Sequence, residues 1–257
     1  MTTNPYATPR AAVADEPVPQ GEYVPGGKGV PASRGWSWLT EGWTLFKAAP
    51  GLWIGITVVF IAIFFAMALV PFAGMIAQYL LMPVFMAGIV LGCRAIDEGK
   101  SLEFNHLFAG FQTRFGTLAA VGGLYLAGFV AIMVVVMLIT GVGVFAVMAG
   151  GAQDVATTGA VLGILLAVLI AVALSVPLLM AVWFAPPLVV FHELDAVEAM
   201  KASFTGCLRN VVPFLLYGIV AMVLLFVAML PLLLGLLVAV PILLASVYTS
   251  YRDVYLR

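Results

Sequence analysis

Charged residues are absent from four long blocks of this 257-residue chain, and their absence limits the fold more than any other feature. The blocks are residues 48–93, 116–153, 155–192 and 210–251. A helix of about 20 apolar residues is long enough to cross the hydrocarbon core of a bilayer. Apolar residues make up 64% of the chain and charged residues 9%, against roughly 45–50% and 25% in soluble domains. We therefore expect an all-α integral membrane protein.

The charge-free blocks divide into six expected transmembrane helices. The first block is too long for one span and breaks near Pro71, and the last block breaks near Pro231. The two middle blocks hold one span each, and the second of these spans either ends near residue 180 or continues past Pro177 toward Phe191. The expected spans are residues 51–71, 74–95, 116–139, 159–180, 211–230 and 235–251.

The basic residues predict the orientation of these spans. Lys and Arg concentrate in short cytoplasmic loops. With six spans, all 11 Lys and Arg fall on one side, and the other side receives only the segments near Pro71, Asp154 and Pro231. Five or seven spans would place basic residues on both sides. The sequence therefore predicts that the N and C termini are both cytoplasmic.

Residues 1–35 differ from the rest of the chain in composition. They contain six prolines and few large apolar side chains, so they cannot bury enough apolar surface to fold. There is no basic segment followed by a short apolar stretch and a cleavage site, as a secretory signal would require. We expect a disordered cytoplasmic tail at residues 1–35, followed by a six-helix membrane domain at 36–257.

Three segments outside the spans carry apolar side chains at helical spacing, and each precedes an odd-numbered span. We predict three helical hairpins, each preceded by an amphipathic helix at the cytoplasmic interface. This repetition indicates an internal repeat. The spacing of two prolines supports it, since Pro83 precedes Arg94 by the same number of residues as Pro241 precedes Arg252. The middle unit differs, because it ends at His192 without an arginine. The three apolar stripes are Trp36, Leu39, Trp43 and Phe46; Phe104, Leu107, Phe108, Phe111 and Phe115; and Leu194, Val197, Phe204 and Leu208.

Small residues recur at every fourth position in the third and fourth spans, a pattern that lets helices approach closely. We expect these two spans to pack against each other, with a self-association face, and hence a homo-oligomer, as the alternative. The two series are Ala119, Gly123, Ala127 and Ala131, and Gly159, Gly163, Ala167, Ala171 and Ser175.

Side chains that could carry out chemistry are scarce, and no ionisable residue lies deep in a span. The cluster of His192, Glu193 and Asp195 indicates a helix start capped by Asp195, with a catalytic base or a metal site as the alternative. Two cysteines are too few for a metal cluster. We therefore expect no cofactor, no metal and no enzymatic activity. A formal net charge of −1 without a basic run also argues against nucleic acid as a partner.

Contacts with lipids or protein partners are the remaining candidate functions of single residues. Four arginines near the expected cytoplasmic ends of the spans could form a ring for lipid headgroups. Three aromatic residues of the amphipathic segments could contact lipids or partners. The candidate contact residues are Trp36, Trp43, Phe111, Arg94, Arg114, Arg209 and Arg252.

Three short motifs resemble a known family. Residues 35–43 (Gly-Trp-Ser-Trp-Leu-Thr-Glu-Gly-Trp), 50–53 (Pro-Gly-Leu-Trp) and 106–111 (His-Leu-Phe-Ala-Gly-Phe) resemble an uncharacterised family of bacterial six-helix inner-membrane proteins. The chain is more distantly similar to the membrane domain of some glycerophosphodiester phosphodiesterases, whose catalytic domain is absent here. The resemblance covers about residues 35–257 and implies a bacterial inner-membrane location. Residues 4–9 are similar to a short N-terminal tag, which implies a docking peptide for a protein partner.

We expect a non-enzymatic protein that organises the membrane by binding its lipids or protein partners. The first alternative is a transporter or channel for an uncharged or lipid-like solute, with a polar cavity around Gln78 and Ser175. The second alternative is a membrane-embedded enzyme that uses His192 and Glu193.

Overall fold

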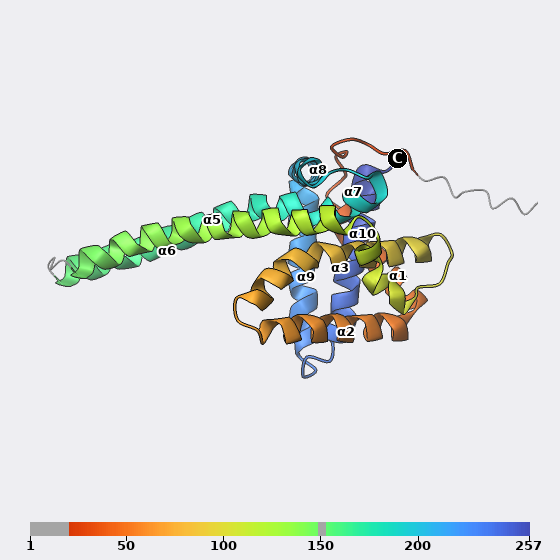
Figure 1. The fold of residues 1–257 in the computed structure, drawn as a ribbon, viewed down its shortest axis with the longest axis horizontal. Coiled ribbons are helices and arrows are strands. Elements are labelled where there is room, and N and C mark those ends of the chain that lie inside the picture. Colours follow the sequence, from red (N-terminus) through yellow and green to blue (C-terminus); the bar gives the residue numbers. More distant parts are fainter. Residues whose placement is uncertain (1–20, 149–152) are drawn as a thin grey trace, which may run out of the picture.

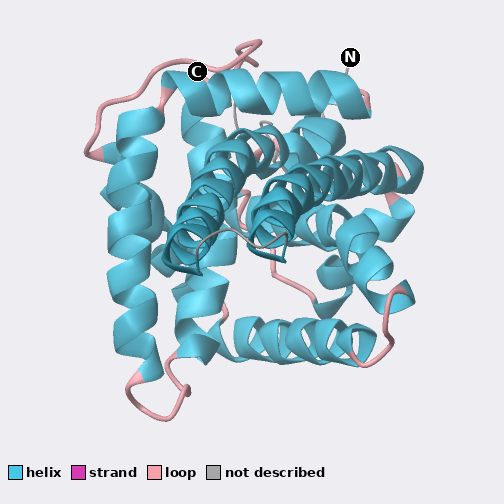
Figure 2. Ribbon diagram, turned by 90° about the vertical axis from the view of Figure 1, so that its left-hand side faces the viewer, coloured by secondary structure: helices cyan, strands magenta, loops and turns pink. Residues whose placement is uncertain are grey.

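The computed structural model describes residues 21–148 and 153–257 of the chain. Helices make up nearly all of these residues, and Figure 2 shows them joined by short loops, with no strand in the described part. An isolated antiparallel bridge pairs Tyr23 with Leu256. The predicted all-α fold is confirmed.

Six of the helical stretches in the described residues are long and apolar enough to cross a membrane, which confirms the predicted number. The fourth stretch, Val161–His192, includes a turn at Phe184, so the longer of the two predicted alternatives holds there. In chain order the helices are α1 (Arg34–Ala48), α2 (Pro50–Ala68), α3 (Ala73–Asp97), the 3₁₀ helix η1 (Phe104–Phe108), α4 (Ala109–Gln112), α5 (Phe115–Met148), α6 (Gln153–Trp183), α7 (Ala185–His192), α8 (Ala196–Arg209), α9 (Val211–Met229) and α10 (Leu236–Tyr255).

The predicted breaks near Pro71 and Pro231 lie between α2 and α3 and between α9 and α10. The stretches that could cross a membrane here, Phe115–Gly141 and Val161–His192, lie close to the predicted third and fourth spans, while helix α5 itself continues to Met148 and α6 begins at Gln153. No proline interrupts residues 116–152, and the hydroxyl of Thr140 donates to the carbonyl of Val136 (2.9 Å) within the helix. The 34 residues of α5 span about 51 Å, more than the roughly 30 Å of a hydrocarbon core.

Helices α5 and α6 lie side by side and extend from the rest of the molecule as a long arm (Figures 1 and 2). The predicted packing of these two spans is thus confirmed, but α5 uses a different face from the one predicted. Leu178 of α6 lies against Gly128 of α5, whereas Ala127 and Ala131 are exposed. Ala167 of α6 is buried. The small residues of α5 therefore lie on a face that does not contact α6.

Helix α1 packs against α9 and α10 through two glycines of the first resemblance motif. A Cβ atom at Gly35 would overlap the carbonyl oxygen of Pro213, and one at Gly42 would lie 2.8 Å from the carbonyl oxygen of Ile242. Trp38 is fully buried on the same face. Of the predicted stripe, Leu39 and Phe46 are buried, whereas Trp36 and Trp43 lie beside the contact face and remain exposed.

The six apolar helices do not run parallel to one another. In Figure 1, the α5–α6 arm runs across the direction of α9 and α10. Consecutive helices do contact each other in the pairs α2–α3, α5–α6 and α9–α10. The three hairpins with their interface helices therefore remain a prediction.

Residues 21–30, which we call the N-terminal strap, bind along the end of α10. The backbone N–H of Val24 donates to the carbonyl of Tyr255 (2.8 Å), and that of Lys28 donates to the carbonyl of Val254 (2.8 Å). Lys28 Nζ donates to the carbonyl of Leu256 (2.7 Å). A helix end leaves carbonyl groups without intrahelical partners, and the strap supplies the donors.

The buried side chain of Asn210 holds the strap from the other side. Its Oδ1 accepts from the N–H of Val30 (2.8 Å), and its Nδ2 donates to the carbonyls of Lys28 (2.9 Å) and Gly206 (2.8 Å). The prediction of a disordered tail at 1–35 is thus corrected for residues 21–33, because their partners are distant backbone groups that composition does not reveal. Residues 1–20 lie outside the described residues.

Replacing Asn210 with alanine should release the strap. Three hydrogen bonds of a fully buried side chain are lost, so we expect the free energy of unfolding to fall by about 1–3 kcal/mol, because the backbone groups left behind stay buried without partners. Hydrogen exchange at Val30 should accelerate. Asn105→Ala, at an exposed position, is the matched control. Unchanged exchange at Val30 in the Asn210 variant would contradict the anchoring role.

Candidate functional site

The ends of α3, α7 and α10 meet at one cavity of about 300 Å³, which we call the polar cavity. Arg94, His192 and Arg252 line it together. These residues end the three units of the predicted repeat, and the structure brings them to a single place. The full lining consists of Gly21, Arg94, Asp97, Glu98, Phe191, His192, Tyr248, Tyr251, Arg252, Leu256 and Arg257.

Arg94 lies between a carboxylate and an aromatic ring. Its Nε donates to Glu98 Oε1 (2.7 Å), and its guanidinium carbon lies 5.1 Å from the centre of the Phe191 ring. The other oxygen of Glu98 accepts from Lys100 Nζ (2.8 Å). The hydrogen bond from Lys100, followed by that from Arg94, lowers the pKa of the Glu98 carboxyl below its usual range.

His192 forms a wall of the polar cavity rather than part of an acidic cluster. Its Nε2 lies 2.6 Å from the hydroxyl of Tyr251, and its ring stacks on that of Tyr23 in the strap, with centroids 3.9 Å apart. Burial raises the pKa of the Tyr23 phenol. The strap therefore covers one side of the imidazole.

The other members of the predicted cluster point elsewhere. The side chain of Glu193 is 81% exposed and lies 3.6 Å from Arg114. Asp195 accepts from the N–H of Glu198 (2.8 Å), which is the predicted helix cap. Within residues 21–148 and 153–257, no three His, Cys, Asp or Glu side chains are grouped as metal ligands.

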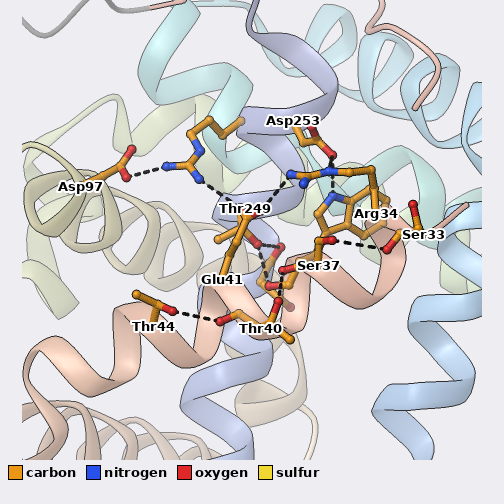
Figure 3. Close-up of polar contacts among 12 residues, drawn as sticks. Ser33, Arg34, Ser37, Thr40, Glu41, Thr44, Asp97, Thr249 and Asp253 are labelled. Carbon is orange, nitrogen blue, oxygen red and sulfur yellow. Dashed lines mark hydrogen bonds and ion pairs between the residues drawn. The ribbon is translucent and has the colours of Figure 1, made fainter. Parts of the chain in front are cut away.

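Arg252 connects the polar cavity to α1 through a chain of ion pairs (Figure 3). It donates to Asp97 and to Glu41 Oε2 (3.0 Å). The other oxygen of Glu41 accepts from Arg34 (2.8 Å), whose Nε also donates to Asp253 (2.6 Å). Helices α1, α3 and α10 are thereby joined by charge-assisted hydrogen bonds.

Sequence reasoning missed the acidic members of this network and Arg34. One signal was available, because Arg34 and Glu41 are seven residues apart and therefore share one face of α1. The partners on α10 and α3 gave no such signal. Trp38 is part of the same contact, since its Nε1 donates to Asp253 (2.9 Å).

A second hollow, which we call the apolar groove, lies between α1, α9 and α10. It has a volume of about 510 Å³, and Thr40 is the polar residue in its lining. Trp36 and Trp43 border it and are 56% and 42% exposed. Lys47 Nζ lies 5.9 Å from the Trp43 ring. The other lining residues are Leu39, Val220, Val223, Leu224, Val227, Val238 and Ile242.

The seven predicted contact residues do not form one surface. Trp36 and Trp43 border the apolar groove, whereas Arg94 and Arg252 line the polar cavity. The three others lie apart from both hollows. Phe111 packs on Phe85 of α3 (centroids 5.2 Å apart), Arg114 pairs with Glu193, and Arg209 donates to the carbonyl of Gly27 in the strap.

Six helices of membrane-spanning length and composition, together with ionic groups gathered at helix ends, define a multi-pass helical membrane protein. A probable inner membrane protein of Burkholderia thailandensis is 30% identical over 197 residues, which cover 74% of this chain and 73% of the relative. The chain belongs to the same family as this protein. The name of the relative gives a location and no activity. No protein-family model matches the chain, and no solved structure matches it.

The lowered pKa of Glu98 predicts a pH dependence. A carboxylate whose pKa is depressed in the folded state stabilises that state above its unfolded pKa of about 4.3, and this stabilisation is lost as the pH falls through the folded value. The difference in thermal unfolding midpoint between the wild type and Glu98→Gln should therefore be largest at neutral pH and shrink below about pH 4. A difference that does not change with pH would contradict the ionic role of Glu98.

Proposed function

We propose that this protein is a non-enzymatic membrane protein that organises the bilayer around it by binding lipid. The observation that carries the proposal is the apolar groove, which runs along the membrane helices α9 and α10 and is bordered by Trp36 and Trp43. In a bilayer, lipid chains surround the outer faces of α9 and α10, and they can therefore enter this groove.

The chemistry of the groove favours an acyl chain. The hydroxyl of Thr40 donates to the carbonyl of Ser37 (3.0 Å), so the polar residue of the lining is satisfied within its own helix. Tryptophan is enriched where membranes meet water, because its ring is apolar and its N–H is polar. Lys47 beside Trp43 adds a cation that could pair with a headgroup phosphate.

The unpartnered side chains of the short helices support their proposed place at the cytoplasmic interface. On α8, Val197 and Leu208 are exposed, while Ala199 and Cys207 are buried against the protein. Phe108 and Phe111, at the junction of η1 and α4, are exposed as well. We place these helices and both termini on the cytoplasmic side of a bacterial inner membrane, with the three hairpins crossing it.

Protein partners and transport are two of the other predicted roles. The proposed docking peptide at residues 4–9 lies outside the described residues. The transport alternative required a polar cavity around Gln78 and Ser175, and neither residue lines the two hollows above. Gln78 instead donates to the carbonyl of Phe64 (2.8 Å) and joins α3 to α2. We therefore keep lipid binding as the proposal.

Lipid binding in the groove is tested with the double variant Trp36→Ala, Trp43→Ala. Removing two large apolar contacts should weaken the affinity for a tightly held lipid about tenfold or more, which corresponds to a combined loss of about 1.4 kcal/mol or more. Native mass spectrometry of protein extracted in nanodiscs measures the retained lipids.

The matched control replaces two aromatic residues that are also exposed but lie outside the groove, Phe65→Ala with Phe226→Ala. Equal retention of lipid in the wild type and in both double variants would refute the groove as the binding site. Both variants must keep the helical circular dichroism of the wild type.

The proposed orientation is tested by labelling with a maleimide that cannot cross the membrane. Cys93 and Cys207 are buried and give a low background. A cysteine introduced by Leu234→Cys should react in intact spheroplasts, because the α9–α10 turn is proposed to face outward. Lys100→Cys should react only after the membrane is opened. The reverse pattern would overturn the orientation.

A further inference from the structure

The polar cavity contains two side-chain carboxylates whose oxygens are already occupied. The two oxygens of Asp97 accept from the hydroxyl of Tyr248 (3.0 Å) and from Arg252. The two oxygens of Glu98 accept from Arg94 (2.7 Å) and Lys100 (2.8 Å). A ligand that needs acceptors for its own protons would have to displace one of these partners.

The helix ends at the cavity are covered as well. The last carbonyls of α10 accept from the strap through Val24 and Lys28. At the end of α3, the N–H groups of Gly99 and Lys100 donate to the carbonyls of Ile96 (3.0 Å) and Ala95 (2.8 Å). The partial negative charge that helix C-termini carry is therefore already matched by donors.

Hydrogen-bond donors, in contrast, are in excess. Arg94 uses its Nε for Glu98, and the described residues offer no acceptor to its two terminal nitrogens. The exposed guanidinium of Arg257 also has no acceptor among the described side chains and carbonyls. Two arginine forks from separate elements thus line one cavity, and such forks bind the paired oxygens of oxyanions.

We propose that the polar cavity binds a phosphate group between Arg94 and Arg257. Phosphate presents more than one pair of oxygens, so two guanidinium groups can bind it from different sides, whereas a carboxylate presents one pair. A volume of about 300 Å³ is at the small end for ligand sites and fits a phosphate with a short substituent, not a whole lipid.

This site is separate from the proposed lipid groove. No residue lines both hollows, and the groove lies near Val238 and Ile242 of α10 while the cavity lies near Tyr248 and Arg252. The phosphate group could belong to a lipid headgroup or to a soluble phosphate. Both sources share the chemistry that the arginines recognise, and the experiment distinguishes them.

The test uses the full chain in a maltoside detergent, which contains no phosphate. Inorganic phosphate is titrated and its dissociation constant is measured by calorimetry. We expect Arg94→Gln to weaken binding at least tenfold, with Arg257→Gln as the second variant, because the exposed Arg257 side chain is not needed for folding. Arg114→Gln, which removes a cation outside the cavity, is the matched control and should bind as the wild type does.

The lipid source is tested in parallel with nanodiscs that contain phosphatidylglycerol and phosphatidylcholine. Enrichment of phosphatidylglycerol that disappears in Arg94→Gln and Arg257→Gln but persists in Arg114→Gln supports the headgroup. Binding of inorganic phosphate with the same dependence supports a soluble phosphate. The proposal is overturned if neither probe depends on Arg94 and Arg257, or if Arg114→Gln reduces binding equally.

The same assay separates this site from the groove. The variant Trp36→Ala, Trp43→Ala should lose groove lipid and still bind inorganic phosphate with the wild-type dissociation constant. The two measurements therefore show separately whether the groove binds lipid and whether the cavity binds phosphate.

Discussion

Glu41 is the central residue of the ion-pair network that joins α1, α10 and α3. It accepts from Arg34 of its own helix and from Arg252 of α10, and Arg252 continues to Asp97 of α3. The charged side chains of this network are partly exposed, so each pair contributes only about 0.2–1 kcal/mol. The network fixes the position of α1 more than it stabilises the fold.

Helices that the network joins border both hollows. On one side of the network, α1 lies against α9 and α10 and leaves Trp36 and Trp43 at the edge of the apolar groove. On the other side, Arg252 is drawn toward α3 and lines the polar cavity with Arg94. Two sites of opposite character therefore share one structural support, and the glycines at 35 and 42 allow α1 to come close enough for it.

The sequence predicted the helices well, because a helix in a membrane satisfies its own backbone and its apolar stretch can be read locally. It failed where the partner is distant. The strap could not be predicted, since its partners are carbonyl groups of residues 254–256, which carry no information about side-chain type. Nor did the sequence show that Gly35 and Gly42 bring α1 into tight contact with α9 and α10. It also did not show that α5 and α6 extend together as a long arm, because an apolar helix can continue beyond the length that a bilayer requires.

The sequence predicted single residues of the candidate sites, but not which of these residues lie together in the structure. Arg94 and Arg252 were selected as cations at helix ends, and the equal spacing from Pro83 and Pro241 indicated that they are equivalent. Their meeting with His192 in one cavity required the packing of α3, α7 and α10. Trp36 and Trp43 were predicted to contact lipids or partners, but the groove beside them is formed mainly by residues of α9 and α10 that look like any other lipid-facing side chains.

The contacts of the strap also have a consequence for synthesis. Lys28 leaves the ribosome 228 residues before its partner Leu256, so the strap is made first and finds its place last. Until α10 is complete, Tyr23 has no Tyr255 beside it, and Asn210 is the partner already available to the backbone of residues 28 and 30. A chain that lacked the last turn of α10 would keep its other membrane helices, but its strap would lack the carbonyl partners at residues 254–256. The strap can therefore bind along α10 only after the end of this helix has been synthesised.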